Sequence, residues 1–159
     1  MIPYKELLSQ NQLSALIRRL RERGYRFTPQ RMAIVRAVLE STGHPSAEEI
    51  YREVSATFPM LSLATVYKTL EMLRDLGEVM ELPVGGRTRY DRNPQPHVHL
   101  ICEKCHTVMD WEEEVAVPVS TERVAATGFH PHHYRVEIYG LCSRCRTGHE
   151  GHTDNGPGT

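Results

Sequence analysis

Residues 62–90 decide the fold of this chain, and they read SLATVYKTLEMLRDLGEVMELPVGGRTRY. The first half starts with a serine that can cap a helix and continues with apolar residues at helical spacing: Leu63, Val66, Leu70 and Leu73. The second half has two short extended runs on either side of Gly85-Gly86, a dipeptide typical of tight hairpin turns. A helix followed by such a hairpin is the second half of a winged helix-turn-helix domain.

Three more helices are predicted before this stretch. Apolar residues recur at helical spacing from about Tyr4 to Gly24, and Thr28-Pro29 places an N-cap before a proline that starts the next helix. Ser46 and Glu49 have the spacing of a capping box and open the third helix, which Phe58-Pro59 ends. The array of helices and hairpin predicts a DNA-binding domain.

The composition is that of a folded protein, with 40% hydrophobic and 25% charged residues. The net charge is −1, yet residues 1–40 hold eight basic and three acidic side chains. This local excess can attract phosphates, although a solvated helix face produces the same pattern. We find neither a signal peptide nor an apolar run of about 20 residues, so we expect a cytoplasmic protein without a membrane partner.

The four cysteines form two C-x-x-C pairs, Cys102/Cys105 and Cys142/Cys145. Without an export signal, disulfides are not expected, and two such pairs are typical of a structural zinc site with four thiolates. Free or redox-active thiols are the alternative interpretation. Because 36 residues separate the pairs, a whole subdomain must lie between them.

The predicted fold class is therefore α+β, in two domains. The domain boundaries that we predict are 1–90 for the winged helix, 91–96 for a hinge, 97–146 for a metal-binding domain and 147–159 for a disordered tail. Within the metal-binding domain we expect strands at 97–101, 107–111 and 134–141, and a partly helical stretch at 115–127. The tail contains His149 and His152, which could bind metal, but a floppy polar tail is the simpler interpretation.

The candidate DNA contacts lie at the start of the helix after Ser62 and on the hairpin. If the apolar face is buried, the residues that point outward are Ser62, Ala64, Thr65, Tyr67 and Lys68. That end of a recognition helix enters the major groove, where such side chains can contact bases and phosphates. Arg87 and Arg89 on the hairpin suit contacts to the backbone or minor groove of double-stranded DNA. Taken singly, each is equally consistent with an exposed polar surface.

A second metal site is suggested by histidines and aspartates. His97 and His99 share one face of a strand, and Asp110 lies on a neighbouring strand. Asp91 in the hinge and His44 before the third helix would complete the set if the chain brings them together. Nitrogen and oxygen ligands suit Fe(II), Mn(II) or Zn(II). A small His/Asp metalloenzyme is a competing hypothesis, but the sequence offers no separate general base or nucleophile motif.

Several motifs together resemble one family over roughly residues 12–146. The motifs are Thr28–Arg31, His44–Tyr51, Ser62–Tyr67, His97–Cys102, Glu137–Gly140 and the two C-x-x-C pairs. They are similar to those of the ferric uptake regulator (Fur) family of bacterial repressors. The resemblance implies a homodimer with a winged-helix domain and an α/β dimerisation domain. It also implies a structural zinc on the four cysteines and a regulatory metal on His44, Asp91, His97, His99 and Asp110.

Within that family the chain most resembles the peroxide-responsive (PerR-like) branch, because that branch has aspartate at the Asp110 position, and Asp91 agrees with it. The positions that supply a further site in many iron-responsive members are Val98 and Tyr134 here. The resemblance implies a metal-dependent repressor of palindromic operators. Its regulatory ion would be Fe(II) or Mn(II), with Zn(II) possible. Fe-catalysed oxidation of His44 or His97 would release the repressor from DNA. Iron, zinc or manganese sensing is the alternative within the family.

Overall fold

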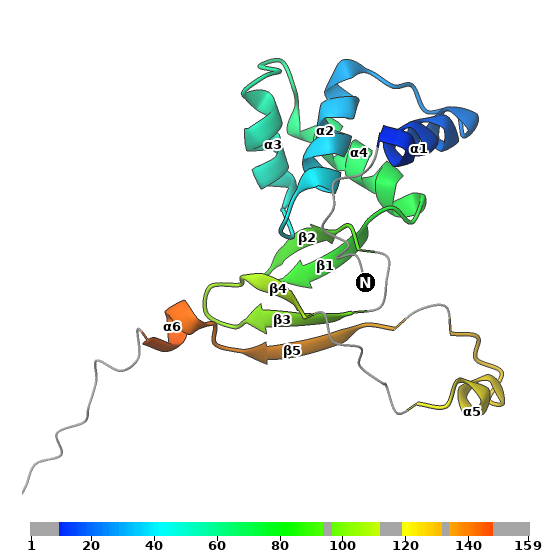
Figure 1. Ribbon diagram of the computed structural model, residues 1–159, viewed down its shortest axis with the longest axis vertical. Helices are drawn as coiled ribbons and strands as arrows, with labels where there is room; N and C mark the ends of the chain where they lie inside the picture. Colours follow the sequence, from blue (N-terminus) through cyan, green and yellow to red (C-terminus); the bar gives the residue numbers. More distant parts are fainter. Residues whose placement is uncertain (1–9, 94–96, 112–118, 132–133, 148–159) are drawn as a thin grey trace, which may run out of the picture. The chain divides into compact units, whose positions relative to one another are not determined.

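The computed structural model describes residues 10–93, 97–111, 119–131 and 134–147. The chain divides into two compact units, residues 1–94 and 95–159. The first unit contains α1 (Gln10–Glu22), α2 (Pro29–Glu40), α3 (Ala47–Ser55), α4 (Leu63–Asp75), β1 (Met80–Val84) and β2 (Arg87–Asp91). The second contains β3 (Val98–Cys102), β4 (Val108–Trp111), α5 (Thr121–Ala125), β5 (Val136–Gly140) and α6 (Ser143–Thr147) (Figure 1).

The helices of the first unit begin where their capping residues predict. The Thr28 hydroxyl accepts a hydrogen bond from the Arg31 amide at 3.2 Å, and Pro29 is the first residue of α2. Both bonds of the predicted capping box are present at the start of α3, Ser46 N to Glu49 Oε2 at 2.8 Å and Glu49 N to Ser46 Oγ at 3.2 Å. Local hydrogen bonding therefore defines where these helices start.

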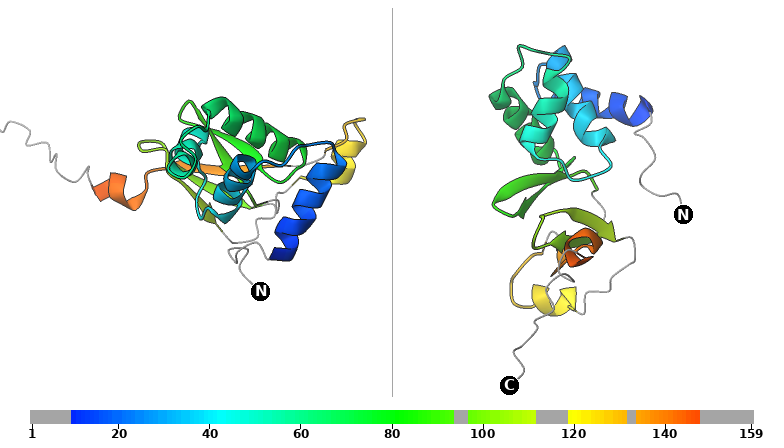
Figure 2. Two further views of the ribbon diagram at one scale, coloured as in Figure 1. Left: turned by 90° about the horizontal axis from the view of Figure 1, so that it is seen from above. Right: turned by 90° about the vertical axis from the view of Figure 1, so that its left-hand side faces the viewer.

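The helices of this unit gather on one side of the β1–β2 hairpin (Figures 1 and 2). Their apolar faces form a single buried core, in which Val66, Leu70 and Leu73 of α4 are completely buried and Leu63 is only partly so. Burial of each such aliphatic side chain contributes about 1.5–3 kcal/mol, so this core is the main source of stability for the unit. The apolar pattern of residues 62–75 thus sets which face of α4 stays outside.

The hairpin turn depends on its two glycines. Gly85 and Gly86 have φ of 59° and 74°, a left-handed conformation that side chains with a Cβ rarely adopt. Val84 pairs with Arg87 directly across this turn, and Met80 pairs with Asp91 at the far end of the antiparallel ladder. Asp91, which we expected in the hinge, is therefore the last residue of β2.

The second unit is built on a three-stranded sheet in the order β4-β3-β5. β3 pairs with β4 in the antiparallel sense and with β5 in the parallel sense. The expected strands are present with slightly shifted ends. The expected helical stretch is reduced to α5 among its described residues, and residues 115–118 lie outside the described part.

Three further expectations concern the ends of the chain, and two of them fall on residues outside the described part. The first helix begins at Gln10, and the expected start near Tyr4 lies outside the described part, as do His149 and His152 of the tail. Thr147, expected in the tail, belongs to α6, a short helix that we did not predict. In the part of the chain that the structure describes, none of the helices has the length and apolar character needed to cross a lipid bilayer.

Candidate metal centres and nucleic-acid interface

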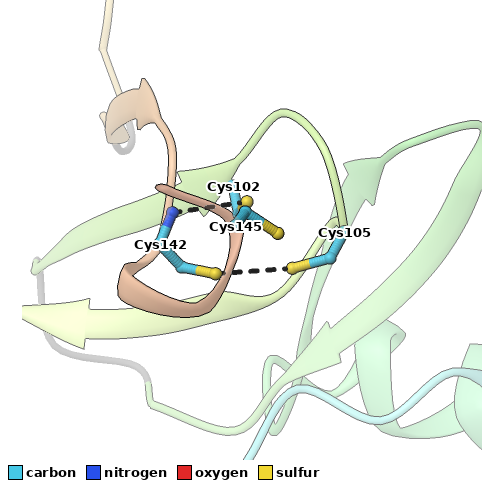
Figure 3. Close-up of side chains that lie close together, drawn as sticks. All are labelled: Cys102, Cys105, Cys142 and Cys145. Atoms are coloured by element: carbon cyan, nitrogen blue, oxygen red, sulfur yellow. Dashed lines mark hydrogen bonds between the residues drawn. The ribbon is translucent and has the colours of Figure 1, made fainter. Parts of the chain in front are cut away.

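The four cysteine side chains meet in the second unit. Cys102 ends β3, Cys105 follows in the turn toward β4, and Cys142 and Cys145 come from the start of α6 (Figure 3). Each ligand atom lies within 4.8 Å of the other three, and none of the four is in a disulfide. The two sequence pairs thus converge as predicted, because the parallel pairing of β3 and β5 brings both knuckles to one end of the sheet.

The sulfur geometry fits a zinc ion. The Cys105 and Cys142 sulfurs are 3.7 Å apart. Zn–S bonds of about 2.3 Å in a tetrahedron place neighbouring sulfurs about 3.8 Å apart, whereas a disulfide would need about 2.05 Å. The Cys142 amide also donates to the Cys102 sulfur at 3.4 Å, a bond typical of a knuckle that holds a thiolate.

The knuckle environment favours thiolates at its first pair. Hydrogen bonding from the Cys105 backbone amide is the main reason that the pKa of Cys102 falls to about 5. The Thr107 hydroxyl, 3.2 Å from the Cys105 sulfur, lowers the pKa of Cys105. Burial raises the pKa of the Cys145 thiol to about 12. Since zinc binds thiolates, occupancy of all four positions must release protons, and zinc affinity falls as the pH falls.

The first unit contributes two candidate ligands of the regulatory site. The Nε2 atom of His44 lies 3.7 Å from Oδ1 of Asp91, although 46 residues separate them in the sequence. The strand pairing of the segment before α3 with β2 explains their approach, since Tyr90 N donates to Pro45 O at 3.0 Å. The same Asp91 oxygen accepts the Asn93 amide at 2.8 Å, which fixes the carboxylate orientation. We call this pair the amino-terminal half-site.

The second unit contributes the other three candidate ligands. His99 pairs directly with Asp110 across the β3–β4 ladder, and His97 lies two residues before it on the same face. The Asp110 Oδ1 atom is 3.3 Å from His97 Nε2 and 3.9 Å from His99 Nε2, and the two ring centroids are 4.4 Å apart. These three side chains form the carboxy-terminal half-site. Both half-sites offer nitrogen and oxygen atoms, the donor set that Fe(II), Mn(II) and Zn(II) accept.

The predicted DNA-contacting residues of α4 differ in how the domain uses them. The Ser62 hydroxyl accepts the Thr65 amide at 3.2 Å and lies 2.9 Å from the Thr65 hydroxyl, so both groups serve the helix cap. The Tyr67 hydroxyl donates to Glu48 of α3 at 2.8 Å, which raises the pKa of Tyr67. The pKa of Glu48 is lowered mainly by a backbone hydrogen bond and further by the bond from Tyr67. Lys68 and Ala64 are exposed.

The two hairpin arginines also differ. Arg87 is exposed beside the glycine turn. The guanidinium of Arg89 instead donates to the His44 carbonyl at 2.9 Å and to Glu49 at 3.2 Å. Arg87 is therefore exposed to solvent, whereas Arg89 is engaged inside its own domain.

The model of the ferric uptake regulator family matches residues 22–139, which include the first cysteine pair, both half-sites and the proposed recognition helix. The chain belongs to the ferric uptake regulator family. Peroxide-responsive repressor PerR of Staphylococcus epidermidis is 41% identical to this Fur-family chain over 137 residues, which are 86% of this chain and 91% of that protein.

Two solved structures of regulators have the same fold. A zinc-bound manganese uptake regulator is 32% identical, with a TM-score of 0.58, and the match covers 82% of this chain and 98% of that one. A zinc uptake regulator complexed with zinc and DNA is 25% identical, with a TM-score of 0.61, and the match covers 89% and 97%. The fold of this Fur-family chain is thus that of an N-terminal winged helix and a C-terminal α/β domain with a four-cysteine zinc site.

Sequence reasoning missed three residues of these sites. Glu48 and Glu49 were assigned only to the first turn of α3, and Arg92 was given no role, although it donates to the Leu39 carbonyl at the end of α2. Glu48 meets Tyr67, Glu49 meets Arg89 in addition to its capping-box partner, and Arg92 meets Leu39. These contacts join residues far apart in the sequence, so no local pattern indicates them. Val98 is buried and Tyr134 is exposed.

Proposed function

We propose that this chain is a homodimeric, metal-dependent repressor that binds palindromic operator DNA and responds to peroxide. We propose that it acts by binding DNA and does not catalyse a reaction. Because its target is DNA, we propose that it is located in the cytoplasm. One observation carries the proposal: each unit has an incomplete set of candidate ligands for the same kind of ion. His44 and Asp91 are two donors, and the carboxy-terminal half-site has three.

Neither half-site alone satisfies a five-coordinate ion, but the two and three side chains of the two half-sites together supply five donors. An ion that needs donors from both units stabilises only the arrangement in which the units bring them together. It therefore shifts the population toward one conformation by its differential affinity. We propose that this conformation is the one in which two copies of α4 fit successive major grooves.

The proposed DNA contacts follow from exposure. Lys68 of α4 and Arg87 of the hairpin are exposed cations that can contact phosphates or guanine, and the Tyr67 ring can contact a base or thymine methyl. The hydroxyls of Ser62 and Thr65 cap α4, so their contribution to DNA binding is to fix the start of the helix next to the backbone. A two-fold dimer requires an operator with two inverted half-sites.

Peroxide sensing is supported by the donor set and by the 41% identical peroxide-responsive repressor. Bound Fe(II) would supply a strong local oxidant on reaction with peroxide, whereas Mn(II) does not undergo this reaction readily. His44 and His97 are the side chains that we propose to gain an oxygen. An oxidised imidazole is a weaker ligand, so the ion is released and the DNA-competent population falls.

The experiment compares operator binding by the metal-free, Mn(II) and Fe(II) forms, each before and after a low dose of peroxide, with peptide mass analysis. We expect binding in both metal forms, and loss of binding only in the Fe(II) form, with one added oxygen on His44 or His97. Lost binding with oxidised cysteines and intact histidines would refute this mechanism. Intact histidines with intact binding would instead favour iron sensing, and metal-independent binding would refute the repressor proposal as a whole.

A further inference from the structure

The segment that carries His44 is a short connector, residues 41–46, between the end of α2 and the start of α3. It contains Gly43 and Pro45 and has no regular secondary structure apart from one bridge between Ser46 and Arg89. A connector of this kind has many conformations available to it when nothing holds it. The structure nevertheless keeps His44 Nε2 within 3.7 Å of Asp91, so other contacts must restrict it.

Arg89, two residues before Asp91, holds one end of the connector. Its Nη1 atom donates to the His44 carbonyl at 2.9 Å, directly on the residue whose imidazole belongs to the half-site. The same nitrogen donates to Glu49 Oε2 at 3.2 Å, and that oxygen also accepts the Ser46 amide at 2.8 Å. The start of α3, the connector and β2 are therefore joined through one guanidinium, which is only 20% exposed.

Arg92, one residue after Asp91, binds the end of α2, just before the connector begins. Its Nη1 atom donates to the Leu39 carbonyl in the last turn of α2. Carbonyls in the last turn of a helix have no partner within the helix, so a cation there is favourable both as a donor and toward the helix dipole. Two arginines close to Asp91 thus bind on either side of the connector's start: Arg92 binds the end of α2, and Arg89 binds His44 itself.

We infer that Arg89 and Arg92 are positioning residues for the regulatory metal: they hold the His44 connector against the strand that carries Asp91 before the ion arrives. The inference rests on the proposed function, because it assumes that His44 and Asp91 are ligands. An ordered half-site loses less conformational entropy when it binds an ion, so metal affinity rises without any new ligand. It also gives Arg89 a different role from the DNA contact that its place on the hairpin predicts.

The test uses the full-length, zinc-loaded protein and Mn(II) as the probe. Arg89→Met removes the two donated bonds and keeps an unbranched side chain of similar length. Losing a charged hydrogen bond of this kind should raise the apparent Mn(II) dissociation constant by about tenfold or more. Operator affinity at saturating Mn(II) should stay near that of wild type. Arg92→Met should shift Mn(II) affinity in the same direction.

Arg87→Met is the matched control, since it removes an exposed arginine from the same strand. It should weaken operator binding at every Mn(II) concentration and leave Mn(II) affinity unchanged. A second readout needs no metal: in the metal-free protein, amide hydrogen exchange of residues 42–46 should be faster in Arg89→Met and Arg92→Met than in wild type, while exchange in the middle of α4 is unchanged.

Arg89→Lys keeps the positive charge but replaces the forked guanidinium by a single ammonium group, so it should give an intermediate Mn(II) affinity. It replaces Arg89→Met in the test if the methionine variant does not fold. Unchanged Mn(II) affinity in these variants overturns the inference. So does an Arg89→Met protein with normal Mn(II) affinity that fails to bind the operator, because Arg89 would then be a DNA contact. Operator binding by wild type that does not depend on Mn(II) would contradict the proposed function instead.

Discussion

At the scale of single residues, Tyr67 shows how one side chain can belong to two surfaces. Its ring lies on the exposed side of α4, and its hydroxyl is bound to Glu48 of α3. A carboxylate beside a proposed DNA-contacting helix would repel phosphates if it were free. Hydrogen bonding to Tyr67 gives that charge a partner and fixes the ring in one orientation.

This pair predicts a pH dependence. The Glu48 carboxylate accepts the phenol proton and repels a phenolate, which is why the pKa of Tyr67 is raised above its ordinary value of 10.0. Glu48→Gln should therefore lower the pKa of Tyr67 toward its ordinary value. Folded-state stability from this bond is present below pH 10 and is lost as the pH rises through the raised pKa. Spectrophotometric titration checks this, with Tyr67→Phe to identify the band. An unchanged titration curve in Glu48→Gln would show that the pair does not form in solution.

At the scale of elements, the caps determine where the helices begin. Ser62 precedes α4 and holds Thr65 through both its amide and its hydroxyl. The start of the proposed recognition helix therefore depends on one exposed hydroxyl.

Ser62→Ala should destabilise the first unit by about 1 kcal/mol, because the Thr65 amide loses its acceptor. Operator affinity should also fall, since the first turn of α4 frays. Ser55→Ala at the end of α3 is the control, because its hydroxyl bonds only the Arg52 carbonyl within its own helix. Denaturant unfolding measures the first effect and operator titration the second. Equal stability of the two variants would argue against a capping role for Ser62.

The sheet of the second unit has one mixed face, which carries the polar candidate ligands, and one apolar face. His99 and Asp110 lie on the mixed face, while Leu100 is paired with Met109 and with Ile138 on the apolar face. Met109 and Trp111 are each 45% exposed and Ile138 is 54% exposed, which is unusual for large apolar side chains of a stable sheet. In a homodimer, a second copy of the chain can cover this apolar face.

Ile138→Ser should weaken the dimer by about 100-fold or more, because two-fold symmetry removes an apolar side chain from both copies. Tyr139→Ser is the control, since Tyr139 is similarly exposed, at 56%, but points to the other face of β5. Sedimentation analysis over a range of protein concentrations measures the dissociation constant. Dimers of equal strength in both variants would show that this face is not the interface.

At the scale of the whole molecule, stability is divided between two different physical sources. The first unit has a continuous buried core from α1 to β2. The second has a three-stranded sheet, short helices and many exposed apolar side chains. A small unit of this kind depends on cross-links, and four thiolates at one end of the sheet supply a place for one.

Cys102→Ser should therefore release zinc and unfold the second unit, while the first unit keeps its melting transition. Structural zinc contributes roughly 10–16 kcal/mol in small domains, more than this sheet can replace. Ser143→Ala, an exposed change in α6 next to the site, is the control. Metal analysis and calorimetry check the prediction. A Cys102→Ser protein that retains zinc and melts like wild type would contradict the four-cysteine assignment.

The sequence by itself determined what short-range chemistry controls. Thr28, Ser46 and Ser62 act on amides three residues away, and Gly85-Gly86 sets a turn between adjacent strands. The two C-x-x-C pairs predicted a zinc site because each pair fixes two thiolates within one turn. These interactions span few residues, so the order of the chain is enough to indicate them.

Only the tertiary structure decided which distant side chains meet. The 3.7 Å approach of His44 to Asp91, the bond between Tyr67 and Glu48, and the engagement of Arg89 with the His44 carbonyl all join separate elements. The pattern on the hairpin predicted Arg87 and Arg89 as equivalent cations. They differ because the strand pairing places Arg89 against the start of α3, where two acceptors need a donor, and leaves Arg87 exposed.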